Sequence, residues 1–281
     1  MSEKHDLHSH SLASDGTLTP TELINRAKEN QVSVLALTDH DTTLGIMEAQ
    51  QAAKKAGINL LPGIEISTTW KNKTLHIIGL NIDPDYSELK LGLEQLQKKR
   101  TLRAEKIAEK LAKKNIPGAL EAINKAAGKS MITRTHFADF LVSNQYVNSQ
   151  QQAFDHYLGQ GKSAFVSIQW AELETAISWI VNSGGIAILA HPLRYKLTAS
   201  WIRRLLGAFK DMGGEAIEVV TGRSTEQDIF ISAKYARDFD LLGSVGSDFH
   251  SPANVWVELG RLGSLPADIV PVWTKINCDH F

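Results

Sequence analysis

Short apolar runs alternate with helical patterns over the first and last thirds of the chain. One helix has a clear start, because Thr19 can cap it, Pro20 suits its first position and Glu22 completes a capping box. A second helical pattern ends at Gly57, a residue type that commonly terminates helices. The predicted strands are 6–10, 32–38, 58–66, 75–82, 186–190, 216–221 and 241–246, and the further predicted helices are 44–56, 170–182, 198–211 and 224–238. Seven strands with intervening helices favour a parallel α/β architecture.

The strand pattern stops between residues 85 and 166, where the sequence is helical and contains no convincing buried strand. We therefore expect residues 1–84 and 167–281 to form one unit and residues 85–166 to form a helical insertion. The charge of the chain is uneven in the same region. Residues 86–134 contain 12 Lys/Arg and 5 Asp/Glu, a local excess of +7, so the rest of the chain carries −8 of the total of −1. A solvated helix explains part of this excess, and a polyanionic partner would explain the remainder.

The composition is that of an ordinary globular protein. With 281 residues, 43% apolar and 22% charged, the chain is long enough for a buried core and is not disordered as a whole. Its one cysteine, Cys278, excludes a disulfide framework and a thiolate zinc site, and fits a reducing compartment. The first residues are polar, and no apolar stretch approaches the roughly 18 residues of a membrane span, so we expect a cytoplasmic protein.

Histidines and carboxylates recur where the predicted strands end. They are His8 and His10 on the first strand, Asp39 and His40 after the second, Glu65 on the third, His76 on the fourth, His191 after the fifth, and Asp248 and His250 after the seventh. The carboxyl ends of parallel strands converge at one edge of a barrel, which favours a barrel over an open sheet. One such histidine alone would suit a hydrogen-bonded core position, but so many ionisable groups together are costly without a cation. Mixed imidazole and carboxylate ligands suit Mn, Fe, Zn or similar divalent ions.

These residues stand in motifs that closely resemble the polymerase and histidinol phosphatase (PHP) superfamily. The motifs are Asp6-Leu7-His8-Ser9-His10-Ser11, Asp15-Gly16, Thr38-Asp39-His40-Asp41, Pro62-Gly63-Ile64-Glu65-Ile66-Ser67, Leu75-His76-Ile77-Ile78-Gly79-Leu80, Ala190-His191-Pro192 and Gly246-Ser247-Asp248-Phe249-His250. Within that superfamily the chain is most similar to the bacterial nucleoside 3′,5′-bisphosphate phosphatase and 5′–3′ exoribonuclease group, whose members share a helical insertion after the fourth strand. The segment Thr133-Arg134-Thr135-His136-Phe137 also resembles that group.

The resemblance implies a distorted, TIM-like (β/α)7 PHP barrel that holds three divalent ions, with Mn²⁺ as the first expectation and Fe, Zn or Mg as alternatives. The implied ligands are His8, His10, Glu65 and Asp248 for one ion, Glu65, His76 and His191 for a second, and Asp15, His40 and His250 for a third. All nine positions carry a competent ligand. This intact set favours an enzyme over a degenerate family member.

The resemblance also implies a reaction, the hydrolysis of the 5′-phosphate ester of nucleoside 3′,5′-bisphosphates or of short 5′-phosphorylated RNA. Metal-activated water would attack phosphorus, so no separate protein base is needed. His136 is a candidate for the acid. The predicted substrate contacts are Arg134, His136, Lys162 and Arg194. We expect a nucleotide or RNA partner, no membrane, and no obligate protein partner.

Three alternatives remain. A metal-dependent amidohydrolase would often carry a bridging lysine on the fourth strand, where this chain has His76. A histidinol-phosphate-type phosphatase has a small substrate that gives no reason for a basic insertion. A non-catalytic nucleic-acid or metal-binding module does not need the complete ligand set.

Overall fold

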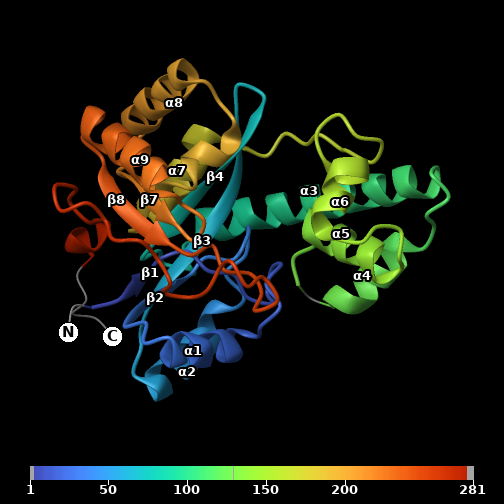
Figure 1. Ribbon diagram of the computed structural model, residues 1–281, viewed down its shortest axis with the longest axis horizontal. Coiled ribbons are helices and arrows are strands. Elements are labelled where there is room, and N and C mark those ends of the chain that lie inside the picture. Colours follow the sequence, from blue (N-terminus) through green and yellow to red (C-terminus); the bar gives the residue numbers. More distant parts are fainter. Residues whose placement is uncertain (1–2, 129, 277–281) are drawn as a thin grey trace.

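A computed structural model describes residues 3–128 and 130–276, and Cys278 lies outside the described residues. Figure 1 shows a barrel-like sheet with helices around it and a helical insertion to one side. The strands are β1 (His5–Asp6), β2 (Val34–Leu37), β3 (Asn59–Trp70), β4 (Lys73–Leu80), β5 (Ala171–Glu172), β6 (Ile186–Leu189), β7 (Ala216–Thr221) and β8 (Leu242–Gly246).

The main sheet runs in the order β1-β2-β3-β4-β6-β7-β8, and β5 pairs with the far end of β3. Backbone hydrogen bonds join its two edges, because Leu7 N–H donates to the Val245 carbonyl at 3.0 Å and Asp248 N–H donates to the His8 carbonyl at 2.8 Å. The sheet is therefore closed into a distorted seven-stranded barrel, as the sequence predicts.

The expectation that all strands run parallel is wrong for β4, which is antiparallel to both β3 and β6. The reason is the connection between β3 and β4. It consists of Lys71 and Asn72, both in the left-handed region with φ of 45° and 62°. Two residues can make a hairpin, whereas a parallel crossover needs a dozen or more.

Five helices pack around the barrel, namely α1 (Pro20–Glu29), α2 (Ile46–Ala56), α7 (Leu173–Asn182), α8 (Ala199–Asp211) and α9 (Glu226–Asp238). The predicted capping box of Thr19 and Glu22 is present, and Gly57 ends α2 with φ of 73°. The helix predicted from Trp170 begins only at Leu173. Ala171 and Glu172 instead join the sheet as β5. The N–H of Trp170, just before this strand, donates to Thr69 Oγ1 at 2.9 Å. Short 3₁₀ turns follow β6 (Pro192–Tyr195) and β8 (Val272–Lys275).

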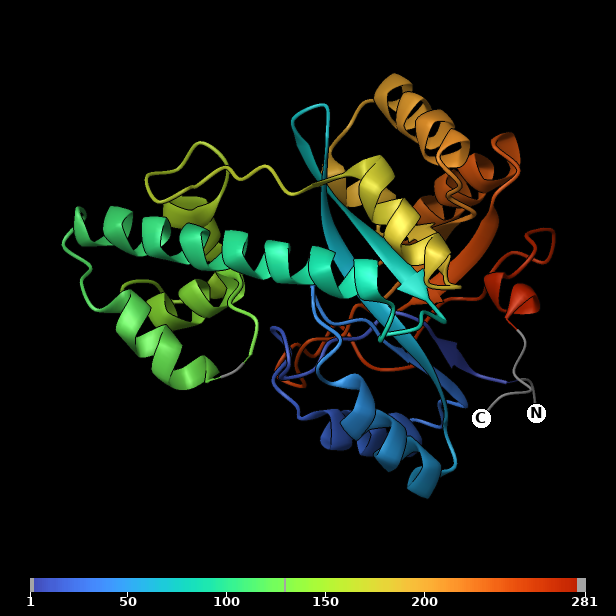
Figure 2. The same cartoon turned by 180° about the vertical axis from the view of Figure 1, so that it is seen from behind.

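The insertion contains α3 (Ser87–Ala112), α4 (Ala119–Ala127), α5 (Arg134–Ser143), α6 (Gln150–Ala153) and a π-helical turn (Phe154–Leu158). The long helix α3 connects it to the barrel, as Figure 2 shows from behind. Near its start α3 lies against α7, where a Cβ on Gly92 would come within 2.5 Å of the Trp179 ring. Further along, Ile107 and Leu111 join Phe137 of α5 in a separate apolar cluster. One helix therefore belongs to both cores, and this fixes the insertion beside the barrel.

None of the helices in the part of the chain that the structure describes is both long and apolar enough to cross a bilayer.

Candidate metal centre

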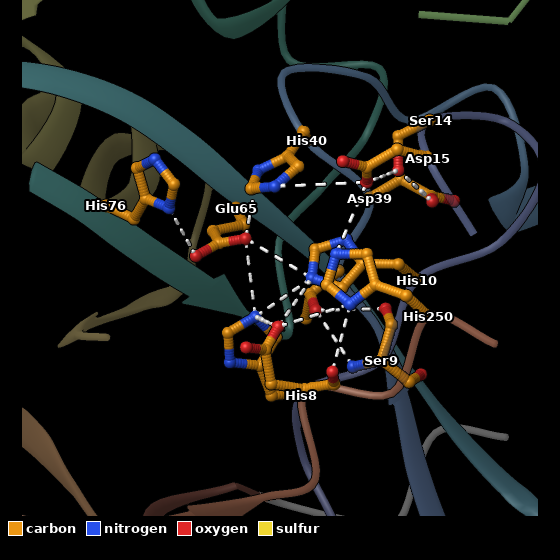
Figure 3. Close-up of polar contacts among 12 residues, drawn as sticks. His8, Ser9, His10, Ser14, Asp15, Asp39, His40, Glu65, His76 and His250 are labelled. Atoms are coloured by element: carbon orange, nitrogen blue, oxygen red, sulfur yellow. Dashed lines mark hydrogen bonds and ion pairs between the residues drawn. The ribbon is translucent and has the colours of Figure 1, made fainter. Parts of the chain in front are cut away.

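Glu65 lies at the centre of a buried cluster of imidazoles and carboxylates (Figure 3). One of its oxygens, Oε1, is 2.8 Å from His76 Nδ1 and 3.0 Å from His191 Nε2. The other, Oε2, is 2.9 Å from His40 Nδ1 and 3.3 Å from the Nε2 atoms of both His8 and His10. Five imidazoles from four different segments therefore surround one carboxylate.

Strand alternation explains how the strand residues reach this cluster. Positions two apart on a strand share a face, so Glu65 shares the inner face of β3 with Leu61, and His76 shares that of β4 with Ile78. His76 stands near the start of β4, not at its end. Because β4 is antiparallel, its start lies at the same edge of the barrel as the ends of its neighbours, and Ser67 on β3 is paired with His76.

The ligand atoms fall into three groups, within each of which all atoms lie within 4.8 Å of one another. The groups are His8, His10, Glu65 and Asp248; His10, Asp15, His40 and His250; and His40, Glu65 and His76. His191 lies outside these groups but contacts Glu65 directly. The structure thus brings all nine predicted ligand residues into one connected cluster.

Several buried polar atoms of the cluster have no hydrogen-bond partner, which fits a site that binds a cation. Among the described residues, six buried side-chain polar atoms have no hydrogen-bond partner, and four of them are Glu65 Oε2, His10 Nδ1, His40 Nδ1 and His191 Nδ1. Three imidazole nitrogens surround Glu65 Oε2, yet none has the geometry of a hydrogen bond to it. Buried polar atoms rarely stay unpaired in proteins, and a shared divalent ion would satisfy this oxygen.

Burial and charge act in opposite directions on these groups. Burial raises the pKa of Glu65, but the positive charges of His40, His76 and His8 outweigh it and hold that pKa well below its usual range. Burial also lowers the pKa of His10, yet the Asp248 and Glu65 carboxylates raise it to about 10. The cluster therefore requires positive charge among its carboxylates, which protons or metal ions can supply.

Glu218 on β7 supports the cluster from behind and has no role in the sequence-based assignment. Its Oε1 accepts from His8 Nδ1 at 3.0 Å, and its Oε2 accepts from the backbone N–H of His191 at 2.6 Å. A carboxylate on one imidazole nitrogen fixes the ring so that the other nitrogen faces the ligand. Gly246 makes room for this contact, because a Cβ there would lie 2.3 Å from His8 Cβ and 2.9 Å from Glu218 Oε1. A buried acid inside an apolar strand is the signal that could have identified Glu218.

Asp39 holds the loop that carries Asp15. It is buried and accepts from Ser11 N–H at 2.8 Å and from the Ser11 and Ser14 hydroxyls, each at 2.6 Å. Asp15 in turn accepts from Thr135 Oγ1 of the insertion at 3.0 Å. The start of α5 is therefore tied directly to the metal-ligand cluster.

The backbone is strained at two of the predicted ligands. His191 and Asp248 have φ of 28° and 56°, in the region that non-glycine residues rarely adopt. Such strain persists only where the surrounding structure enforces it, and it gathers at functional sites.

The four predicted substrate residues differ in placement. Arg194 forms an ion pair with Asp248. His136 lies in the first turn of α5, where its Nδ1 accepts from Thr133 N–H at 3.1 Å, and burial lowers its pKa. Arg134 is half-buried with its guanidinium 5.7 Å from the centre of the Phe154 ring. Lys162 is exposed, and its backbone bonds stay within the turn that follows Leu158.

Arg134 has two neighbours that the sequence analysis did not single out, Arg100 and Arg103. Burial and the charges of Arg134 and Arg100 lower the pKa of Arg103 to about 9. Arg100 is buried, pairs with Asp41 at 2.6 Å and donates to Ser67 Oγ at 2.9 Å. Its position on the apolar stripe of α3, between Leu96 and Ala104, is the sequence signal for an arginine that faces the protein. These three side chains are called the arginine cluster below.

Comparisons with known proteins agree with this geometry. The model of the PHP domain matches residues 6–221. A Haemophilus influenzae protein described as a 5′-3′ exoribonuclease is 48% identical over 275 residues, which are 98% of this chain and 100% of that protein. A Chromobacterium violaceum protein described as a 3′,5′-nucleoside bisphosphate phosphatase is 42% identical over 273 residues, covering 97% of this chain and 96% of that protein.

A solved structure from Chromobacterium violaceum, described as an amidohydrolase with bound SO4 and no metal, has a TM-score of 0.93 at 41% identity. The match covers 97% of this chain and 95% of that one. On the family match and on these relatives, the chain belongs to the PHP domain family.

Proposed function

We propose that this chain is a metal-dependent phosphoesterase. It hydrolyses the 5′-phosphate ester of nucleoside 3′,5′-bisphosphates, and in short 5′-phosphorylated RNA it hydrolyses the phosphodiester bond after the first nucleotide, which releases nucleotides one at a time as a 5′–3′ exoribonuclease. The observation that carries the proposal is the cluster around Glu65, whose Oε2 is buried and has no hydrogen-bond partner. The descriptions of the relatives supply the substrate class.

The proposed metal ligands are those of the three geometric groups together with His191. Imidazole and carboxylate donors without thiolate suit manganese, with iron, zinc or magnesium as alternatives. When bound, such ions supply a nucleophilic water at neutral pH and steady the attacking and leaving oxygens of a phosphoryl group. Glu65 on β3 joins two of these groups, whereas many amidohydrolases use a bridging lysine on the fourth strand, where this chain has His76.

The protein's own residues orient this site. Glu218 fixes the ring of His8, and Asp39 fixes the loop that carries Asp15, through the hydrogen bonds described above. Arg194 pairs with Asp248 at the rim and is 41% exposed, so it can also reach a phosphate.

His136 is better suited to donate a hydrogen bond than to act as the acid. Its Nδ1 accepts from a backbone N–H, so a neutral ring carries its proton on Nε2. Burial lowers its pKa, which keeps the ring neutral near pH 7. We assign it the role of binding phosphate through Nε2–H.

The arginine cluster supports a substrate with a second phosphate. Three guanidinium groups lie together, and Asp41 is the one carboxylate among the described residues that pairs with them. An anion placed there would relieve their repulsion. A small substrate of the histidinol-phosphate type gives this cluster no role.

These contacts support a division of the chain into two functional parts. We propose that residues 1–84 and 167–281 form the metal-binding barrel and that residues 85–166 form a lid that binds substrate. Thr135 bonded to Asp15 and Arg100 paired with Asp41 support this arrangement. Nucleotide and RNA substrates also favour a cytoplasmic location.

A side-by-side assay tests the function. Manganese-loaded protein is given adenosine 3′,5′-bisphosphate and a 5′-phosphorylated oligoribonucleotide, and metal content is measured in the same sample. We expect release of 5′-phosphate from the first and of nucleotides from the second, with both reactions abolished by His8→Ala and Asp248→Asn. Metal-loaded wild-type protein that acts on neither substrate would refute the assignment of substrate.

A further inference from the structure

A cleft of about 530 Å³ adjoins the metal centre. His191 and Glu218 line its inner end, while Arg194, Lys196 and Arg223 line it further out. Gln151 of the insertion also lines it, so the cleft extends from the lid to the start of α9. We propose that this cleft binds the phosphodiester backbone of the RNA nucleotides that follow the first one. The inference rests on the proposed function. It names the part of the site that contacts RNA but not a nucleoside bisphosphate.

The cations of the cleft are available to a ligand. Lys196 and Arg223 are exposed, and neither forms an ion pair with any described residue. Arg194 is already paired with Asp248. The free positive charge therefore lies on the outer part of the cleft, away from the metal ligands.

The acids of the cleft are already engaged. Glu218 accepts from His8 and His191, and Asp228 Oδ2 accepts from the Thr225 N–H at 2.8 Å and the Thr225 hydroxyl at 2.7 Å. Asp228 thereby completes the capping box of α9. Its charge lowers the positive potential locally, but it leaves Lys196 and Arg223 without a neutralising partner.

The loop that presents Arg194 and Lys196 is held in an unusual conformation. Left-handed residues stand at both of its ends, His191 with φ of 28° and Lys196 with φ of 51°. Tyr195 anchors it, because its hydroxyl accepts from the His76 N–H at 2.9 Å. A lysine in a left-handed conformation between anchored residues indicates a loop shaped to place its charges.

The size of the cleft matches a nucleotide and not only a phosphate. Pockets of about 300–1,000 Å³ bind molecules of that size. A nucleoside bisphosphate held at the metal centre ends at its 3′-phosphate, whereas an RNA chain continues and needs a path. Exposed cations along an open cleft are typical of sites that follow a single-stranded backbone.

Substrate length tests the inference. kcat/KM is measured with adenosine 3′,5′-bisphosphate and with 5′-phosphorylated di-, tri- and pentanucleotides for wild type, Arg223→Gln and Lys196→Asn. Asparagine is chosen because it tolerates the left-handed backbone at that position. Arg204→Gln, an exposed arginine on α8 with no ion pair to a described residue, is the matched control.

We expect wild-type kcat/KM to rise with length, and each variant to lose roughly fivefold on the pentanucleotide while changing less than about twofold on the bisphosphate. The slope of log KM for the pentanucleotide against the logarithm of salt concentration should fall by about 0.7 for each cation removed. An equal loss on every substrate would overturn the inference, because the cations would then bind the 3′-phosphate common to all. No loss on any substrate would overturn it as well. Wild-type protein inactive on all of them would refute the proposed function itself, which is a separate result.

Discussion

The metal centre and the basic cleft lie side by side at one edge of the barrel, yet they are built in opposite ways. The predicted ligands of the centre lie on six strands or in the segments that follow them, and most are buried. The outer cations of the cleft stand on loops, are exposed and have no ionic partner among the described residues. We therefore assign the chemistry to residues positioned by the barrel strands, and the selection of substrate to side chains that can change without disturbing the barrel.

The largest effect should follow from Glu65→Gln, which removes the charge at the centre of the cluster. We expect kcat on every phosphate substrate to fall on the order of a thousandfold, because positively charged ions and imidazoles lose their shared carboxylate. Steady-state kinetics and metal analysis check this result against Glu174→Gln, an exposed acid on α7. Activity within tenfold of wild type would mean that the buried cluster is structural.

The link between barrel and insertion should affect stability. Arg100→Met leaves the buried carboxylate of Asp41 without its ion-pair partner, which costs about 3–5 kcal/mol in the free energy of unfolding. Urea unfolding measures the change. The double variant Arg100→Met with Asp41→Asn should recover most of it, since no unpaired charge remains. Equal losses in the single and double variants would contradict this account of the pair.

The support of the centre is tested by Glu218→Gln. Glutamine has one carbonyl oxygen, so it cannot accept from both His8 Nδ1 and the His191 N–H as the two carboxylate oxygens do. We expect metal affinity to fall by about 10- to 100-fold while saturating metal restores activity. Titration calorimetry with Mn²⁺ measures the affinity, and an unchanged dissociation constant would remove Glu218 from the metal site.

The smallest effect in this series should come from the arginine cluster. We expect Arg134→Gln to raise KM for the bisphosphate by roughly tenfold, the value of one charge-assisted hydrogen bond. Because Arg134 lies near other guanidinium groups, its loss should not lower the melting temperature. An unchanged KM would exclude Arg134 from substrate binding, and a lower melting temperature would show a structural role.

The sequence predicts the barrel and the positions of the ligand residues because strand ends and their polar residues are local features. His191 directly follows the apolar run 186–190, and His40 lies three residues after the buried run that ends at Leu37; a barrel brings such strand ends together. The antiparallel course of β4 does not follow from the predicted strands 58–66 and 75–82, because these leave eight residues between them, whereas β3 and β4 leave only the two-residue turn of Lys71 and Asn72.

The supporting residues were harder to predict, because their partners are distant in sequence. Glu218 meets His8 across 210 positions, and Arg100 meets Asp41 across 59. Each stands at an apolar position of its strand or helix, which indicates burial but not the identity of the partner. Only the folded chain supplies that identity.

The most direct test of the central claim is the rate of 5′-phosphate release from adenosine 3′,5′-bisphosphate as a function of bound manganese per chain, measured on one preparation from metal-free to saturated. We predict that the metal-free protein is inactive and that the rate rises with bound metal and returns to zero on chelation. Full activity without metal, or saturated binding with no phosphate release, would contradict the claim that the Glu65 cluster is a metal-dependent phosphoesterase centre.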